Sequence, residues 1–350
     1  MARTGLLVRT GLASLIAASL IGLTAPPSSA ADLLTADAST IAGATLAATP
    51  PNPTSPPGVS PDVYFEDETG TYYMWAPSVP NMRMYSSTDG STWSEVAGAT
   101  LPRGFDPTVI KLGPGNYRMY FGGIAQGVAS TVQCSQQRKS LYYATSTDLV
   151  TWTTQPGTLF DDLGCGVPDI VRKPDGSYLM YYVTMTGGHG VHMATSPDGL
   201  SWTAITGLHP TTEDIVDPSV IVMPDSTYLM VSSDMGRGTQ QLHIMSSPDG
   251  IDWTLRSTPL YAPAGVSAFD PNLNLINGRL RVWYGYAPQG AYDDSHITNG
   301  ILTLVRGSVP SSSKVGKPGT ACKKSGTKVT YQGKTLVCRK VKGSLVWKRA

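Results

Sequence analysis

Short segments in which apolar and polar residues alternate recur along most of the chain, and they are rich in aromatic residues. Five of them are similar to one another: "TYYMW" at 71, "NYRMYF" at 116, "SYLMYY" at 177, "TYLMVS" at 227 and "RLRVWYG" at 279. Alternation with a period of two is typical of β-strands that bury one face. The pattern therefore predicts an all-β protein built from repeated units.

A turn followed by a tryptophan occurs in each of the first four units. These segments are "SSTDGSTW" ending at Trp93, "TSTDLVTW" at Trp152, "TSPDGLSW" at Trp202 and "SSPDGIDW" at Trp253, about 50 to 60 residues apart. Asp and Gly favour tight turns, and the tryptophan that follows can begin a strand and pack between neighbouring sheets. We interpret the turn aspartates as structural parts of the repeat; they are Asp89, Asp148, Asp198 and Asp249.

A third segment, with a proline near its start, precedes the aromatic strand of each unit. It reads "SPDVYF" at 60, "FDPTVI" at 105, "GVPDIV" at 166, "VDPSVI" at 216 and "FDPNLN" at 269. Each unit thus has four strands, and five such units predict a five-bladed β-propeller.

The fifth unit lacks the Asp turn and the Trp strand, so its sheet needs an outer strand from elsewhere. Residues 41–46, "IAGATL", resemble residues 96–101, "VAGATL", which we expect to be the outer strand of the first blade. The N-terminal stretch is therefore predicted to close the ring as the outer strand of the last blade, which removes exposed sheet edges.

The prolines before the five first strands align, and acidic residues flank them. The residues before the prolines are Ser60, Asp106, Val167, Asp217 and Asp270, and those after them are Asp62, Thr108, Asp169, Ser219 and Asn272. Positions two apart in a strand share a face, and the first strand of a blade lines the axis. We therefore expect five carboxylates around one funnel, in two tiers.

Aspartate at a strand start can also be a turn cap, so each single position has a purely structural alternative. All five together fit that alternative less well, because like charges crowded on an axis repel one another unless sugar, metal or arginine compensates them. The funnel is the predicted functional site.

The five-unit layout, the "YATSTDLVTW" type of segment and the alternating "DP" and "PD" strand starts resemble glycoside hydrolase family 43 and its relatives, which include arabinanases and xylosidases. The resemblance covers roughly residues 40 to 306. It implies hydrolysis with inversion by a general-base Asp, a tuning Asp and a general-acid Glu, with acid and base about 6.5–9.5 Å apart. It assigns Asp106 in "FDPTVI" as the base and Asp217 in "VDPSVI" as the tuning residue.

The general acid is where the sequence departs from this family. The corresponding strand start is "AFDPNL", with Asp270 in place of Glu, and only Glu213 among the four glutamates lies on a loop that enters a central strand. Three alternatives stay open: Asp270 is the acid, Glu213 is the acid, or the propeller binds glycan without cleaving it. A sialidase-like enzyme is a weaker hypothesis, because three turns place Gly directly after Asp and the central strands carry no arginine triad.

Further residues are predicted to contact the substrate. Arg237 lies between glycines in "DMGRGTQ", and a guanidinium suits sugar hydroxyls or carboxylates. The full predicted set is Asp62, Asp169, Arg237 and His189. No cofactor is required. Clustered carboxylates suit a hard cation such as Ca²⁺, but no Asp-rich loop has ligand spacing, so no metal site is assigned.

The chain ends add a predicted location. Arg3 and Arg9, the apolar run and the small residues Ser28 and Ala30 form the pattern of a secretory signal that is removed after Ala30. An exported protein can form disulfides. We expect one between Cys134 and Cys165 at the pocket rim and another between Cys322 and Cys338.

Charge is divided unevenly along the chain. Residues 31–306 hold 13 Lys or Arg against 25 acids, whereas residues 307–350 hold 11 Lys or Arg and no acid. The acidic body argues against nucleic acid as the main partner, and the resemblance implies a carbohydrate partner instead. The basic tail can contact cell wall or another anionic surface, which would retain the secreted protein at the cell surface, or it is simply a solvated appendage. We expect a monomer.

The predicted organisation has five parts. They are a signal peptide at 1–30, a closing strand and Pro-rich connector at 31–59, the propeller at 60–309, a linker at 310–318 and a small disulfide-stapled β-hairpin module at 319–350.

Overall fold

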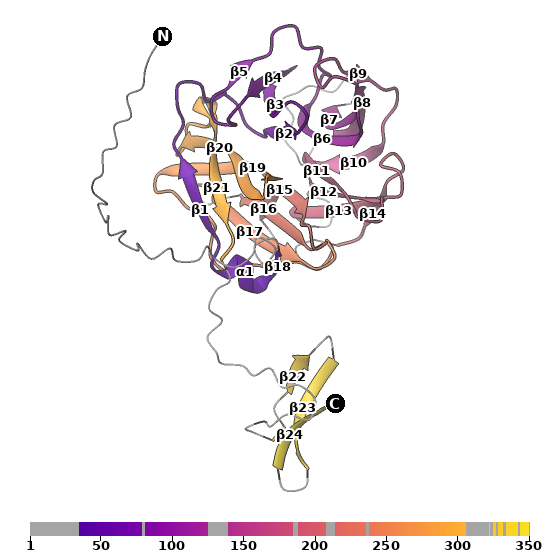
Figure 1. The fold of residues 1–350 in the computed structure, drawn as a ribbon, viewed down its shortest axis with the longest axis vertical. Helices are drawn as coiled ribbons and strands as arrows, with labels where there is room; N and C mark the ends of the chain where they lie inside the picture. The colour runs from indigo at the N-terminus through magenta and orange to yellow at the C-terminus, as the bar shows by residue number, and fades with distance from the viewer. Residues whose placement is uncertain are drawn as a thin grey trace, which may run out of the picture.

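The computed structural model describes residues 35–78, 81–124, 139–184, 188–207, 214–235 and 238–305, and in the C-terminal module residues 322, 325–326, 328–331, 334–341 and 344–349. Five antiparallel sheets surround a common axis, with the first strand of each sheet innermost (Figure 1). These inner strands are β2 (Asp62–Glu66), β6 (Phe105–Gly113), β11 (Gly166–Arg172), β15 (Ile215–Val222) and β19 (Val266–Ile276). The predicted five-bladed β-propeller is confirmed.

Each blade runs outward from the axis in chain order. Blade one continues with β3 (Thr71–Ser78), β4 (Asn81–Ser87) and β5 (Ser94–Glu95); blade two with β7 (Asn116–Ile124), β8 (Lys139–Ser146) and β9 (Thr153–Thr154). Blade three continues with β12 (Tyr178–Thr184), β13 (Gly190–Ser196) and β14 (Thr203–Ile205); blade four with β16 (Tyr228–Asp234), β17 (Leu242–Ser247) and β18 (Thr254–Leu255). Blade two gains one strand that the repeat does not predict, β10 (Phe160–Gly164), which pairs with β8.

The N-terminal segment closes the ring. Blade five contains β20 (Arg279–Pro288) and β21 (His296–Thr303), and β1 (Thr45–Thr49) pairs antiparallel with β21, as Figure 1 shows. The predicted role is confirmed, but the boundaries differ. Residues Ala38–Ala42 form helix α1, which the side chain of Asp37 caps, so the strand begins after the helix rather than at residue 41.

The comparison that led to this prediction was wrong for blade one. The outer strand there is only Ser94–Glu95, and residues 96–101 do not form a strand. Gly98 has φ +77° in this segment, a conformation that glycine adopts without strain and that bends the chain away from the sheet.

The turn tryptophans pack between blades, as expected. Trp152 of blade two meets Trp75 on β3 of blade one edge-on, with ring centroids 5.8 Å apart. Trp253 of blade four meets Tyr181 on β12 of blade three in the same way, at 5.7 Å. Each of these tryptophans therefore joins its blade to the preceding one through buried aromatic area.

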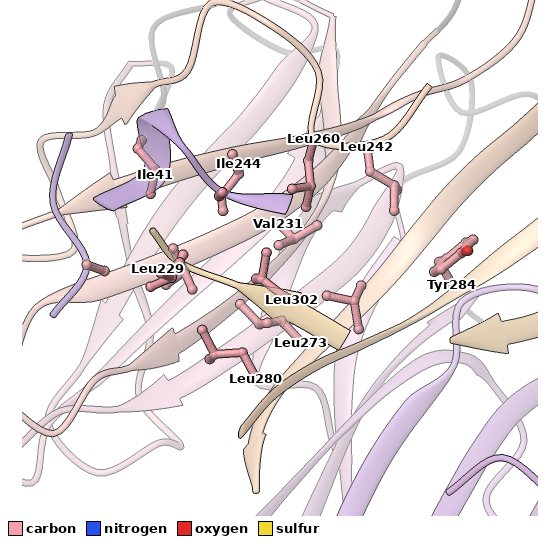
Figure 2. Packing of buried hydrophobic residues seen from close by; sticks show 14 of the residues in the cluster. Ile41, Leu229, Val231, Leu242, Ile244, Leu260, Leu273, Leu280, Tyr284 and Leu302 are labelled. Carbon is pink, nitrogen blue, oxygen red and sulfur yellow. The ribbon is translucent and has the colours of Figure 1, made fainter. Parts of the chain in front are cut away.

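The segment before β1 packs against the propeller through the apolar side chain of Ile41. Ile41 of α1 is 1% exposed and lies among side chains of blades four and five, including Leu229, Ile244 and Leu302 (Figure 2). Burial of an isoleucine side chain stabilises a fold by about 1.5–3 kcal/mol. The helix and the strand together hold the N-terminal segment in place.

The turn aspartates are satisfied within their own turns. Asp198 Oδ1 accepts hydrogen bonds from the backbone N–H groups of Leu200 and Ser201, both at 2.8 Å, and from the Ser196 hydroxyl at 3.0 Å. Equivalent bonds occur at Asp89, Asp148 and Asp249. Their structural interpretation is confirmed.

The C-terminal module contains the predicted hairpin and one strand more. Strands β22 (Lys328–Tyr331) and β23 (Lys334–Val341) pair as expected, and β24 (Ser344–Arg349) adds a third strand on the other side of β23. The predicted Cys322–Cys338 disulfide is present, and Cys338 lies opposite the buried Trp347. Within the parts of the chain that the structure describes, no helix is long and apolar enough to cross a membrane.

Candidate active site

The residue before each aligned proline has a left-handed backbone. The φ angles lie between +44° and +51° at Ser60, Asp106, Val167, Asp217 and Asp270. A left-handed conformation costs a residue other than glycine about 1–3 kcal/mol and persists only where the surrounding structure imposes it. Five such positions around one axis mark this end of the blades as a specialised region.

The residues on both sides of each aligned proline face the axis for a different reason from the one that the sequence suggests. In blades two to five the strand register shifts across each of these positions, for example between Val216 and Ser219 on β15. The simple alternation that the sequence suggests is therefore interrupted by a bulge. The left-handed residue brings the positions before and after the proline to the same pocket.

The pocket lies on the axis, as predicted, and is small, with a cavity volume of about 30 Å³. Asp62, Asp106, Asp169 and Asp270 line it. Asp217 is only 8% exposed and is hydrogen-bonded to Asp270, so it completes the cluster from the side of blade four. We call these five groups the axial carboxyls.

Asp217 and Asp270 form a carboxyl pair. Burial, the negative charge of Asp217 and the hydrogen bond between the two groups raise the pKa of Asp270 well above its ordinary value. Burial also raises the pKa of Asp217, although the Ser233 hydroxyl donates a hydrogen bond to Asp217 Oδ2. Ser60 donates to Asp270 Oδ2 from its backbone N–H (3.1 Å) and its hydroxyl (2.9 Å). The pair therefore holds a proton to a higher pH than an isolated aspartate does.

Asp106 has different surroundings. Its Oδ2 accepts a hydrogen bond from the Val167 backbone N–H at 3.1 Å and lies 3.7 Å from the Lys139 ammonium nitrogen. Both contacts favour the charged form of a carboxyl group. The pocket thus combines an ion-paired carboxyl group on one side with a hydrogen-bonded carboxyl pair on the other.

The positions after the prolines form a closed ring of hydrogen bonds from blade to blade. In each bond, the side chain of one blade reaches the backbone of the next inner strand around the axis. The bonds are Val109 N–H to Asp62 Oδ2 (2.9 Å), Thr108 hydroxyl to the Pro168 carbonyl (2.6 Å), Val220 N–H to Asp169 Oδ2, Leu273 N–H to Ser219 Oγ (2.9 Å) and Val63 N–H to Asn272 Oδ1 (3.1 Å).

Asp62 and Asp169 are therefore parts of the inter-blade ring as well as of the pocket. Burial, with a smaller contribution from the charge of Asp169, raises the pKa of Asp62 to about 8. Burial raises the pKa of Asp169 to about 7. Their hydrogen bonds connect strands some 50 residues apart, which gives both a structural role beneath the pre-proline tier.

The rim holds one of the remaining predicted residues. His189 is 19% exposed in its side chain, and its Nδ1 lies 3.4 Å from Asp214 Oδ1. Glu213, Arg237 and Cys134 lie outside the described residues, so the alternative acid, the proposed sugar contact and the Cys134–Cys165 bond stay predictions. Cys165 is not a free thiol.

Three residues of the site carry no sequence pattern that identifies them. Ser60 occupies an aligned position but has no acidic group, and Ser233 reaches Asp217 from the second strand of its own blade. Lys139 is the first residue of β8, and the sequence pattern does not show how this strand pairs with its neighbours. Among the described residues, no group of three or more His, Cys, Asp or Glu side chains is arranged to hold a metal ion.

No protein-family model matches this sequence, and no curated protein is significantly similar to it. The fold does match solved structures. The endo-arabinase from Bacteroides thetaiotaomicron is 15% identical with a TM-score of 0.54, and the alignment covers 75% of this chain and 96% of that one. The α-L-arabinanase from Cellvibrio cellulosa, solved with arabinohexaose, is 12% identical with a TM-score of 0.52, covering 84% and 96%.

A third similar structure is the xylan β-1,4-xylosidase from Bacillus halodurans. It is 14% identical with a TM-score of 0.58, over 73% of this chain and 56% of that one. Identities at this level are evidence for the fold. The chain has the five-bladed β-propeller fold of these arabinanases and this xylosidase.

Proposed function

We propose that this protein is a glycoside hydrolase that cleaves glycosidic bonds of poly- or oligosaccharides with inversion. The observation that supports this most directly is the unequal state of the carboxyl groups around one pocket. Asp106 accepts a hydrogen bond from the Val167 N–H and forms an ion pair with Lys139, whereas Asp270 is hydrogen-bonded to Asp217, which raises the pKa of Asp270. Acid–base hydrolysis requires one carboxylate and one carboxylic acid on a single sugar.

In the proposed reaction, Asp106 removes a proton from the attacking water while Asp270 donates a proton to the departing glycosidic oxygen. Asp217 favours the protonated form of Asp270 before the reaction, because two adjacent carboxylates repel each other. The same repulsion drives Asp270 to regain a proton after each turnover. The Val167 N–H and Lys139 fix the orientation of the Asp106 carboxylate.

The proposed substrate is a neutral glycan that contains arabinose or xylose. The pocket is lined by carboxyl, hydroxyl and amide groups between the prolines, and these polar groups suit sugar hydroxyls. The similar structures include arabinanases and a xylosidase, one of them solved with arabinohexaose. Secretion through residues 1–30, a monomeric state and contact of the basic tail with an anionic surface belong to the same proposal.

A second candidate function is glycan binding without cleavage. Asp270 stands where related enzymes are expected to carry glutamate, and its side chain is one methylene shorter. Ser60 and Asp217 both hold it by hydrogen bonds. If these contacts keep the acid from reaching the glycosidic oxygen, the pocket binds a sugar and leaves it intact.

Hydrolysis of chromogenic arabinosides, xylosides, galactosides and fructosides separates the two functions. The wild-type protein should release the chromophore, and Asp106→Asn and Asp270→Asn should each lower kcat/KM by about 10²–10⁴, the usual contribution of general acid–base catalysis. Nuclear magnetic resonance of the first product should show the inverted anomer. Glu213→Gln should keep its activity if Asp270 is the acid.

The binding function has its own signature in the same experiment. Wild type and both aspartate variants would be equally inert, while calorimetry with arabino- or xylo-oligosaccharides would still detect binding. That result would end the hydrolase proposal.

A further inference from the structure

One lysine forms an ion pair with an axial carboxyl. Lys139 lies at the start of β8 in blade two, with its Nζ 3.7 Å from Asp106 Oδ2 and 5.0 Å from the centroid of the Phe105 ring. Its side chain is only 22% exposed, and that of Asp106 is 11% exposed. Across the described part of the chain, no other Lys or Arg forms an ion pair with an axial carboxyl.

The backbone of the next blade leaves room for this ion pair. Gly166 has φ +101°, and a Cβ placed there would lie 2.9 Å from Lys139 Nζ and 3.0 Å from Asp106 Oδ2. A side chain at this position would therefore push against both partners. The absence of one allows the ammonium group and the carboxylate to meet beneath Val167, whose N–H binds the same oxygen of Asp106.

The position of Lys139 is asymmetric with respect to the carboxyl groups. It contacts Asp106, whereas Asp217 and Asp270 contact each other. Several further charged or titratable groups belong to the elements packed around Asp106 and Lys139. They are Asp161 and Asp162 on β10, Asp169 on β11, Asp62 on β2, and His189 and Asp214 at the rim.

We propose that Lys139 is a positioning residue whose positive charge, through its ion pair with Asp106, stabilises the ionised form of this proposed base. A positive charge within about 4–6 Å of a carboxyl group favours its charged form and typically lowers its pKa by about one to three units. Without Lys139, Asp106 faces two other carboxyl groups with one N–H donor as its remaining support. The base and acid would then compete for the same proton.

Titration of the aspartate carboxyl carbons by nuclear magnetic resonance tests this without any substrate. In protein labelled at aspartate, the Asp106 resonance is identified by its loss in Asp106→Asn. We expect the titration midpoint of Asp106 to rise by about one pH unit in Lys139→Met, the lower end of the range because the pair is partly exposed. Lys139→Arg should restore the wild-type midpoint to within about 0.3 units, because it keeps the charge.

Two controls separate this effect from a general disturbance. Lys173→Met removes a lysine whose ion pair with Asp175 is far more exposed, and it should leave the Asp106 midpoint unchanged. Lys139→Gln replaces Lys139→Met if the latter does not give the wild-type near-ultraviolet circular dichroism spectrum. An Asp106 midpoint that is the same in wild type and in the folded neutral variant would overturn the proposal.

The kinetic consequence rests on the proposed hydrolysis. The acidic limb of the kcat/KM profile should move upward with the Asp106 midpoint in Lys139→Met and return in Lys139→Arg. If the wild-type protein hydrolyses nothing, the proposed function fails, and the titration still decides the role of Lys139.

Discussion

Aspartates occur at two ends of the same repeat, and the structure lowers the pKa of one kind and raises that of the other. Near the outer strands, Asp198 accepts backbone hydrogen bonds from Ser201 and Leu200, which lower its pKa to about 2. On the axis, burial raises the pKa of Asp62 to about 8 and that of Asp169 to about 7. The residue type and the repeat are shared, and the charge state differs.

The difference comes from the source of the hydrogen-bond donors. A turn aspartate finds its donors within three residues, at the protein surface, so its environment is complete before the blades assemble. An axial carboxyl is buried by the assembly itself and depends on donors from another blade, as Asp62 depends on Val109 N–H. A general acid that works near neutral pH needs the second kind of site, because burial raises the pKa of a carboxyl group there, whereas the turn hydrogen bonds lower it.

The largest expected effect is on activity. Asp217→Asn removes the negative charge that keeps the proton on Asp270, and it should lower kcat/KM at least about 100-fold. Asp198→Asn keeps one oxygen for the turn and should change kcat/KM by less than about twofold. Equal losses in the two variants would show that the axial cluster is not the reactive site.

A smaller effect concerns stability against pH. A folded-state pKa above the unfolded value means that the folded protein binds more protons, so stability falls as pH rises from about 4 to about 8. Each unit of difference costs about 1.4 kcal/mol as an upper limit. Asp62→Asn loses one hydrogen bond, so it should be less stable than wild type at pH 5, and this gap should narrow by pH 8.5.

Thermal unfolding followed by circular dichroism from pH 5 to pH 8.5 measures this slope. Asp198→Asn is the matched control, because the lowered pKa of Asp198 makes its contribution disappear only as pH falls through about 4 to 2. A wild-type Tm that rises steadily from pH 5 to pH 8.5 would contradict the raised values on the axis.

The smallest expected effect belongs to a single turn. Asp249→Ala removes the acceptor of the Ile251 and Asp252 N–H groups, both at 2.9 Å, and should lower the free energy of unfolding by about 1 kcal/mol. Activity should be unchanged. Urea denaturation provides the measurement, and a loss above about 4 kcal/mol would mean that the turn also supports the neighbouring blade.

Much of the architecture could be predicted because it is local and repeated. The strand pattern, the turn aspartates and the prolines at the inner strands each depend on a few consecutive residues, and five copies remove the ambiguity of one. The outer strand of blade one was predicted wrongly for the opposite reason. Residues 96–101 resemble a strand only by comparison with the N-terminal segment, and Gly98 turns the chain there instead.

The candidate site could be predicted as a set of residues but not as a set of charges. The aligned prolines identify the five axial carboxyls from sequence alone, since each stands at a fixed distance from its proline. Lys139 and Ser233 could not be found in this way. Ser233 lies on the second strand of blade four and Lys139 on the third strand of blade two, and the register of these strands depends on how they pair.

The sequence by itself determined the number of blades, the segment that closes the ring and the acidic residues that face the axis, because these follow from short patterns that repeat. The tertiary structure decided which carboxyl pairs with Lys139, which two form a hydrogen bond with each other and which two bind the blades together. Those properties depend on burial and on partners that are distant in the chain. The left-handed residues before the prolines bring these groups to one pocket, and their conformation is imposed only when the five blades meet.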